Sequence, residues 1–153
     1  MLKPLEQFYC DTCGELINTV EEGYVEWLSS TDYSSRQITN QEFSIIHNKR
    51  ECSSRNRNDS QQSASLKDFT KEKGLVNLLS KIDCGPIHNP NFNGPNISEF
   101  RIYLEFMRRL TLPYYEEARK YWTEAVGDGY FNDMNEIKIY LPDTLKGLIE
   151  KYS

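Results

Sequence analysis

Three cysteines and one histidine in the first third of the chain have the types and spacing of a zinc site. Cys10 and Cys13 form a Cys-x2-Cys pair followed by Gly14, and His47 and Cys52 follow downstream as His-x4-Cys. Three thiolates and an imidazole are a donor set of tetrahedral structural zinc sites, in which the protein fills every position and leaves none for a substrate. We therefore predict a structural Zn²⁺ held by Cys10, Cys13, His47 and Cys52.

Other interpretations of these residues remain open. Cys84 or His88 could replace His47 as the fourth ligand, and the cysteines could also be ordinary buried thiols. A thioredoxin-like redox pair is disfavoured, because it requires a βαβ context after the Cys-x2-Cys motif. Here the motif is followed by Glu-rich sequence with the character of β-strands.

Cys84 and His88 form a second constellation that could carry chemistry. They lie in a loop rich in Gly, Pro and Asn, from residue 84 to residue 96. A thiolate with a neighbouring imidazole can act as a nucleophile with its base, so a hydrolase or transferase is the alternative function. No known catalytic signature surrounds the pair, so we favour a structured connector and expect the protein not to be an enzyme.

Charge limits the classes of partner. The chain carries a net charge of −5, and residues 1–48 contain two basic and eight acidic side chains. Such a surface repels phosphate, which disfavours nucleic acid as the ligand of a zinc module. The segment 49–67 is basic, with Lys49, Arg50, Arg55, Arg57 and Lys67 against Glu51 and Asp59. Binding of nucleic acid through this segment is a second alternative function.

Charged side chains on the expected helices have a simpler interpretation. The carboxylates there are Glu99, Glu105, Glu116, Glu117 and Glu124. Neither histidine stands in the Glu-x-x-His pattern of a helical dimetal site, so we expect these residues to lie on solvated helix faces. Arg108 and Arg109 add a local basic pair.

The elements that must position these residues fall into three regions. For residues 1–52 the β-branched and aromatic content predicts a β module with strands at 24–28 and 43–47. The two strands are joined as a hairpin across the polar residues 29–35. Residues 53–65 are polar and predict a flexible linker or loop. Residues 66–153 predict a mainly helical region, which could form one continuous domain with the first.

Apolar periodicity locates the helices of the third region. It predicts helices at 74–82, at 100–110 and from 114 to about 127. Pro142 stands at a position that suits the start of a last helix, which we expect to run to about Tyr152. Alternation of Ile137, Ile139 and Leu141 with polar residues predicts a short strand between the last two helices.

The turn Cys10-Asp-Thr-Cys13-Gly14 resembles the knuckles of zinc-ribbon and treble-clef modules, over residues 8–52 at most. Treble clefs place the second ligand pair at the start of a helix, where this chain has a polar linker. The resemblance therefore implies a ribbon-like or irregular β knuckle.

Together these observations predict an α+β fold with an N-terminal zinc-stapled β-hairpin or knuckle module and a C-terminal helical region. The sequence contains no apolar run of the roughly twenty residues that a membrane-spanning helix needs, nor a secretory signal. We expect a small cytoplasmic zinc-binding protein that acts as a protein-interaction or regulatory module, with another protein as its partner.

Overall fold

The computed structural model describes residues 1–54, 60–87 and 90–153, and the fold is α+β. A four-stranded sheet has the order β5-β3-β4-β6, and a two-stranded sheet is made by β1 and β2. The strands are β1 (Phe8–Tyr9), β2 (Leu16–Ile17), β3 (Gly23–Asp32), β4 (Gln37–His47), β5 (Gln61–Ser65) and β6 (Asn93–Ile97). The α-helices are α1 (Lys71–Ile82), α2 (Phe100–Thr111), α3 (Tyr115–Ala118), α4 (Trp122–Gly127) and α5 (Pro142–Tyr152).

The hairpin that the sequence predicts is present as β3 and β4, which form the centre of the larger sheet. Val25 and Ile45 face each other across the two strands and are fully buried on the inner face of the sheet. The strands are longer than predicted, because Ser29 to Asp32 continue the antiparallel pairing with β4. The turn is correspondingly short, and the Asp32 carboxylate holds it by accepting hydrogen bonds from Ser34 and Ser35.

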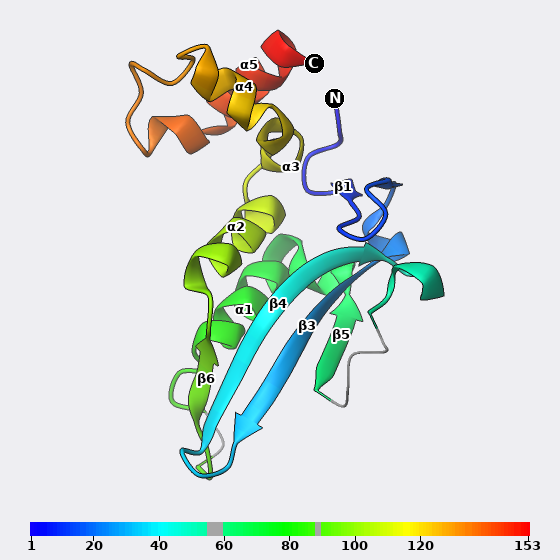
Figure 1. The fold of residues 1–153 in the computed structure, drawn as a ribbon, viewed down its shortest axis with the longest axis vertical. Helices are drawn as coiled ribbons and strands as arrows, with labels where there is room; N and C mark the ends of the chain where they lie inside the picture. The colour runs from blue at the N-terminus through cyan, green and yellow to red at the C-terminus, as the bar shows by residue number, and fades with distance from the viewer. Residues whose placement is uncertain (55–59, 88–89) are drawn as a thin grey trace.

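Helices α1 and α2 lie against one face of this sheet, and no helix covers the other face in the described part of the chain (Figure 1). An aromatic cluster fills the space between the two layers. Phe43 on β4 stacks on Trp27 and contacts the rings of Tyr103 and Phe106 on α2. The predicted helices at 74–82 and 100–110 are confirmed as α1 and α2, and the ring contacts show that Tyr103 and Phe106 of α2 face the sheet.

Two strands occur where the sequence predicts irregular structure. The expected linker at 53–65 contains β5, which pairs antiparallel with β3. The expected loop between residues 84 and 96 runs into β6, which pairs in parallel with β4. Both segments are poor in apolar residues, so it is pairing with an existing strand that orders them. Leu66 and Phe69, just after β5, belong to the same core as Phe8 and Val25.

The predicted strand at 137–141 is wrong, because these residues contain the 3-10 helix Lys138–Tyr140. The side chain of Asn135 accepts hydrogen bonds from the backbone N–H groups of Ile137 and Lys138, at 3.2 and 2.8 Å. Such a local side-chain bond offers the backbone an alternative to a strand. The last helix is confirmed, with Pro142 in its first turn.

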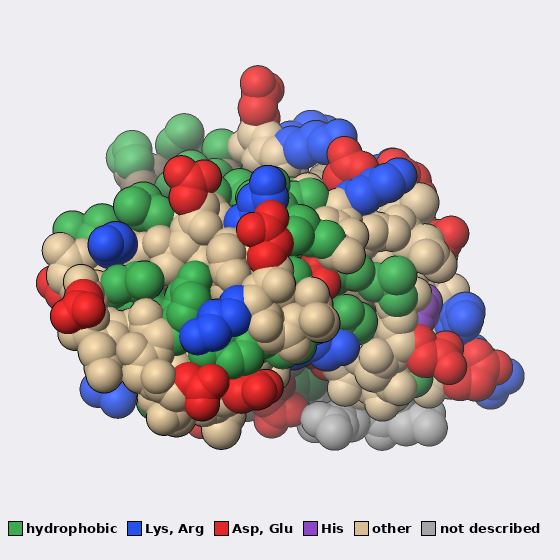
Figure 2. All heavy atoms as spheres, turned by 90° about the horizontal axis from the view of Figure 1, so that it is seen from above, with side chains coloured by type: hydrophobic (Ala, Val, Ile, Leu, Met, Phe, Trp, Pro, Cys, Tyr) green, Lys and Arg blue, Asp and Glu red, His purple; other side chains and the backbone are tan. Residues whose placement is uncertain are grey.

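Residues 112–153, which we call the C-terminal unit, have a core of their own. Its buried members are Tyr115, Ala118, Ala125, Leu145, Leu148 and Ile149. The unit lies at the end of the molecule opposite the tip of the β3–β4 hairpin, next to the N-terminus (Figure 1). Seen from this end, apolar side chains are interspersed with acidic and basic ones (Figure 2).

Candidate metal centre

The first two cysteines lie on a tight turn between β1 and β2. These strands pair with Phe8 opposite Ile17, and we call residues 8–17 the knuckle loop. Cys10 accepts a hydrogen bond from the backbone N–H of Gly14 at 2.8 Å, and its own N–H donates to the Glu15 carbonyl at 2.9 Å. Gly14 has a φ of +75°, a conformation that glycine adopts without steric cost. The turn directs the thiols of Cys10 and Cys13 to the same side of the loop.

The other two residues come from the end of the long hairpin. His47 is the last residue of β4, and Cys52 ends the short 3-10 helix Arg50–Cys52. The Thr12 hydroxyl donates to the Cys52 carbonyl at 2.8 Å, which ties the second pair to the knuckle loop. Residues 8–17 and 47–52 thus meet although more than thirty residues separate Cys13 from His47.

The four donor atoms have the spacing of a tetrahedral metal site. The Sγ atoms of Cys10, Cys13 and Cys52 and a ring nitrogen of His47 all lie within 4.8 Å of one another. Nδ1 of His47 is 3.4 Å from Sγ of Cys13 and 3.9 Å from Sγ of Cys52. With ordinary Zn–S and Zn–N bonds, a tetrahedron has edges of about 3.5 to 3.8 Å. The structure therefore brings together all four residues that the sequence predicts as ligands, close enough to hold a metal ion.

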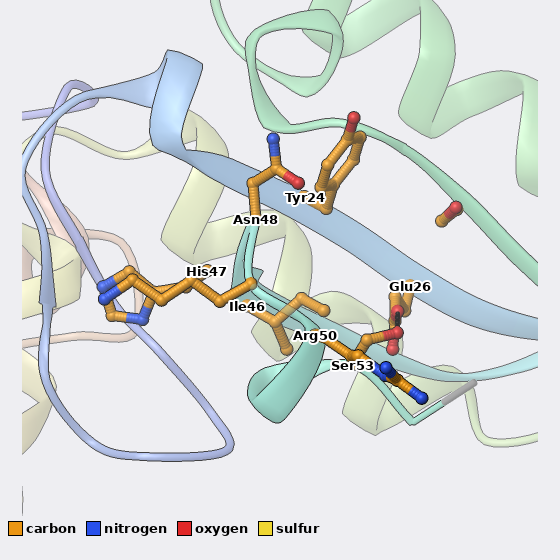
Figure 3. Close-up of a pocket in the computed structure, with 9 residues that line it drawn as sticks. Tyr24, Glu26, Ile46, His47, Asn48, Arg50 and Ser53 are labelled. Atoms are coloured by element: carbon orange, nitrogen blue, oxygen red, sulfur yellow. Dashed lines mark hydrogen bonds between the residues drawn. The ribbon is translucent and has the colours of Figure 1, made fainter. Parts of the chain in front are cut away.

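The orientation of the imidazole leaves one nitrogen for a metal. Nε2 of His47 lies 3.2 Å from the carbonyl oxygen of Leu16 in β2. A carbonyl only accepts, so Nε2 carries the proton and Nδ1 presents its lone pair to the sulfurs. Figure 3 shows the His47 ring turned away from Glu26. Leu16 is a functional neighbour that the sequence does not reveal.

The environment separates two of the thiols by their pKa. Burial raises the pKa of Cys10, but backbone N–H donors of Cys13, His47 and Thr12 outweigh it and lower the value to about 6. Burial, reinforced by the adjacent Cys13 and Cys10, raises the pKa of Cys52 to about 12. The cluster thus stabilises the thiolate of Cys10 but resists ionisation of Cys52, since like charges would be packed together. A bound cation would remove this repulsion.

Three of the four residues are shielded from solvent. Cys10, His47 and Cys52 are buried, while Cys13 is exposed. Four protein donors complete the coordination of a tetrahedral ion, so that no position remains for a substrate or an activated water molecule. The arrangement suits a structural ion and gives no direct access for metal-based catalysis.

A buried ionic network supports the knuckle loop from the side of the helices. Nη1 of Arg109 lies 2.9 Å from both carboxylate oxygens of Asp11, between the two cysteines of the turn. Nε of the same guanidinium lies 2.7 Å from Glu116, whose carboxylate also binds Arg119. Arg109 and Glu116 are 6% and 5% exposed, so the expectation of a solvated helix face is wrong for Glu116. It is wrong for Glu117 as well, which is also buried.

The sequence offers little signal for this network. Arg109 and Glu116 are charged residues of a kind that is mostly exposed in proteins, and only their tertiary position buries them. Burial opposes the charge of Glu116, but Arg109 and Arg119 outweigh it and lower its pKa. The pKa of Arg109 is raised, because its hydrogen bonds and charge interactions with Glu116 and Asp11 outweigh the opposite effect of burial.

A pocket of about 380 Å³ lies beside the metal centre and is lined by Tyr24, Glu26, Ile46 and the segment from His47 to Arg50, among others. Glu26 in its wall is almost fully buried, and Figure 3 shows it next to Ser53. Its carboxylate accepts hydrogen bonds from Ser53, Ser54 and Gln61. These bonds fasten the chain after Cys52 to β3, so Glu26 positions the last ligand.

The second constellation is not brought to this centre within the described residues. Cys84 lies exposed after α1, where its thiol donates to the Ser80 carbonyl at 3.5 Å, and it is not a member of the metal cluster. His88 lies outside the described residues, so the predicted Cys84–His88 pair stays a prediction. Of the basic segment 49–67, Arg55, Arg57 and Asp59 also lie outside them.

In comparison with known proteins, no family model, no curated protein and no solved structure matches the chain. Among the residues that the structure describes, no helix has the length and apolar character needed to cross a membrane. The assignment of a function therefore rests on the geometry of the metal centre and of the surface around it.

Proposed function

We propose that this protein binds one structural Zn²⁺ through Cys10, Cys13, His47 and Cys52 and acts as a protein-interaction or regulatory module of the cytoplasm. The observation that carries the proposal is the convergence of four donors of the right types within 4.8 Å. The spacing of Nδ1 of His47 to two of the sulfurs supports a tetrahedral ion. A donor set of three sulfurs and one nitrogen favours zinc over the oxygen-seeking Mg²⁺ and Ca²⁺.

The structural role follows from what the ion would join. Cys10 and Cys13 come from the knuckle loop, while His47 and Cys52 come from the end of the central hairpin. Strands β1 and β2 are two residues long, and an isolated hairpin of this size is not stable in water. Zinc would supply the free energy that holds the knuckle loop against the sheet.

The interaction half of the proposal is supported by the outer face of α1. Gly74 and Leu78 face the core, whereas Leu75, Val76 and Leu79 on the other side of the helix are 50%, 69% and 49% exposed. Neighbouring apolar side chains that remain in water on a helix are typical of surfaces that bind other proteins. We infer that a protein partner covers this face.

Metal analysis tests the central claim. Protein purified from cells without added metal should contain close to one zinc per chain, and Co²⁺ substitution should give the absorption bands of tetrahedral thiolate coordination. A preparation with less than a few tenths of a zinc per chain, which also takes up none on titration, would refute the proposal.

Affinity purification tests the interaction half. Leu75→Asp with Leu79→Asp should remove proteins that the wild type retains, whereas Lys71→Asp with Lys73→Asp, also exposed on α1, should keep them. If both double variants retain the same proteins as the wild type, the α1 face is not the interaction surface. Circular dichroism would establish that both variants stay folded.

A further inference from the structure

The C-terminal unit reaches the knuckle loop at Tyr9 and Asp11, directly through Glu116 and indirectly through Arg109 of α2, which binds Glu116. Asp11 accepts from Nη1 of Arg109, at the end of α2, and the Tyr9 carbonyl accepts from Nη2 of the same guanidinium at 3.1 Å. The Tyr9 N–H donates to Glu116 of α3 at 2.9 Å. Tyr9 and Asp11 flank Cys10. Their positions therefore depend on how firmly the turn that carries the first metal ligands is held.

The N-terminal segment adds a second set of contacts to α3 and the residues after it. The backbone N–H of Leu2 donates to the carboxylate of Glu117, and the amino terminus lies 3.8 Å from the same carboxylate. The ammonium group of Lys120 lies 3.4 Å from the centre of the Tyr9 ring. Residues 1–11 therefore hold the start of the C-terminal unit along its length.

Charge balance makes Asp11 indispensable to this junction. Arg109 and Arg119 share the single carboxylate of Glu116, and Arg109 and Glu116 are buried. Without Asp11 the cluster holds two guanidinium groups against one carboxylate, and an uncompensated buried charge is costly. Asp11 is in turn held in place by two hydrogen bonds with the backbone of Ile45.

We propose that occupancy of the metal centre controls the docking of the C-terminal unit onto the N-terminal segment, through Asp11, Tyr9 and their partner Arg109. The inference rests on the proposed metal binding and goes beyond it by assigning the ion a regulatory consequence. With metal bound, the turn holds Asp11 and Tyr9 where Arg109 and Glu116 need them. Without the metal, the two hydrogen bonds of Asp11 to Ile45 remain, but the turn loses its link to His47 and Cys52, so that Tyr9 and Asp11 are held less firmly.

The C-terminal unit can undock as one body. It has its own apolar core, and only three residues connect Thr111 at the end of α2 with Tyr115 at the start of α3. Further side-chain contacts of the unit run to α2, where Tyr115 donates to Glu105 and Arg108 lies over the ring of Tyr140. Release from the N-terminal segment would therefore expose one face of α3 without dismantling the core of the unit.

Hydrogen–deuterium exchange of the full chain, with zinc bound and after chelation, tests the inference. Residues 115–121 should exchange about tenfold faster or more in the metal-free protein, since each lost hydrogen bond to a charged group has an effect of this order. Helix α1 should change much less. If the protein binds one zinc and exchange at 115–121 is the same in both states, the inference is overturned while the metal site stands.

A variant on the far side of the junction separates coupling from general unfolding. In zinc-loaded Arg109→Gln, residues 115–121 should exchange as fast as in the metal-free wild type, and chelation should have no further effect there. Arg101→Gln, exposed in the first turn of α2, should keep the wild-type response. If residues 115–121 of zinc-loaded Arg109→Gln exchange as slowly as in the zinc-loaded wild type, the inference is overturned. This holds even if the metal-free wild type unfolds completely.

Should Arg109→Gln fail to fold, Asp11→Asn tests the same junction from the knuckle loop, with zinc content measured on the same sample. Zinc-loaded Asp11→Asn should lose protection at 115–121, and retained protection would overturn the inference. Absence of zinc binding by the wild type is a different result, because it refutes the proposed function itself.

Discussion

His47 and Leu16 are joined by a hydrogen bond of 3.2 Å between Nε2 of the imidazole and the backbone carbonyl oxygen. This contact orients the ring so that Nδ1 faces the sulfurs of Cys13 and Cys52. We therefore expect the zinc-loaded protein to show a single His47 tautomer by long-range ¹⁵N NMR, with the proton on Nε2 and the metal on Nδ1. The opposite tautomer would contradict the geometry.

A matched pair of cysteine variants tests the ligand set. Cys52→Ala should lose most of the bound zinc, because it removes one of four donors from the cluster. Cys84→Ala should keep about one zinc per chain, since Cys84 is exposed and lies outside the cluster. Metal content after gel filtration measures both, and zinc loss in the Cys84 variant would show that the ligand set is wrong.

Zinc binding should release protons in a manner that the thiol pKa values predict. Between pH 7 and 8 Cys10, with a pKa of about 6, is largely a thiolate, while Cys52, with a pKa of about 12, is a thiol. Cys52 must lose its proton to become a ligand, so affinity should rise with pH, by about tenfold per unit for each proton released.

Calorimetry in buffers of different ionisation enthalpy measures this release. The number of protons released on zinc binding should fall by about one in Cys52→Ser and by much less in Cys10→Ser. The change in zinc affinity of each variant is measured separately. A binding enthalpy that is independent of the buffer in the wild type would contradict the expected release.

Glu116→Gln should destabilise the protein at neutral pH by about 3 kcal/mol, because it leaves buried guanidinium charge without its partner. The folded pKa of Glu116 is lowered, so its contribution is complete above the unfolded value of about 4.3 and is lost as the pH falls below it. The difference in unfolding free energy between wild type and variant should therefore shrink in acid. Urea denaturation at several pH values measures it, with Glu124→Gln, an exposed carboxylate, as a control expected to change stability by less than about 0.5 kcal/mol.

Two glycines in helices should respond to alanine in opposite ways. Gly74 lies in α1, where an added Cβ would overlap the backbone carbonyl of Phe69, so Gly74→Ala should destabilise. Gly127 ends α4 with nothing within 4 Å of an added Cβ, so Gly127→Ala should be neutral or stabilise by up to about 1 kcal/mol. Thermal unfolding of the two variants compares them. Equal effects of the two substitutions would contradict the close packing of α1 on the segment before it.

Several elements could be predicted from local pattern. The β-branched and aromatic residues around Val25 and Ile45 predict the hairpin, and Pro142 marks the start of α5. Apolar residues at helical spacing predict α1 and α2, because burial on one face leaves a periodic signature in the sequence. The metal centre could be predicted for a different reason, since few residue types bind zinc and their spacing in a turn is restricted. Gly14 marks that turn.

Other elements depend on neighbours that lie far away in the sequence. Strands β5 and β6 carry little apolar signal and exist because β3 and β4 offer backbone donors and acceptors to pair with. At residues 137–141 an alternating pattern predicts a strand, but no strand among the described residues pairs with this segment and the Asn135 side chain bonds the backbone instead.

The sequence by itself thus determines the four donors, the turn that carries two of them and the helices and hairpin with periodic burial. Only the tertiary structure decides that Arg109 and Glu116 are buried and that Asp11 completes their charge balance. The physical reason is that a charged side chain has the same local pattern in water and in a buried ion pair. Its role depends on whether the fold brings an opposite charge to it, which here is the residue between the first two candidate ligands.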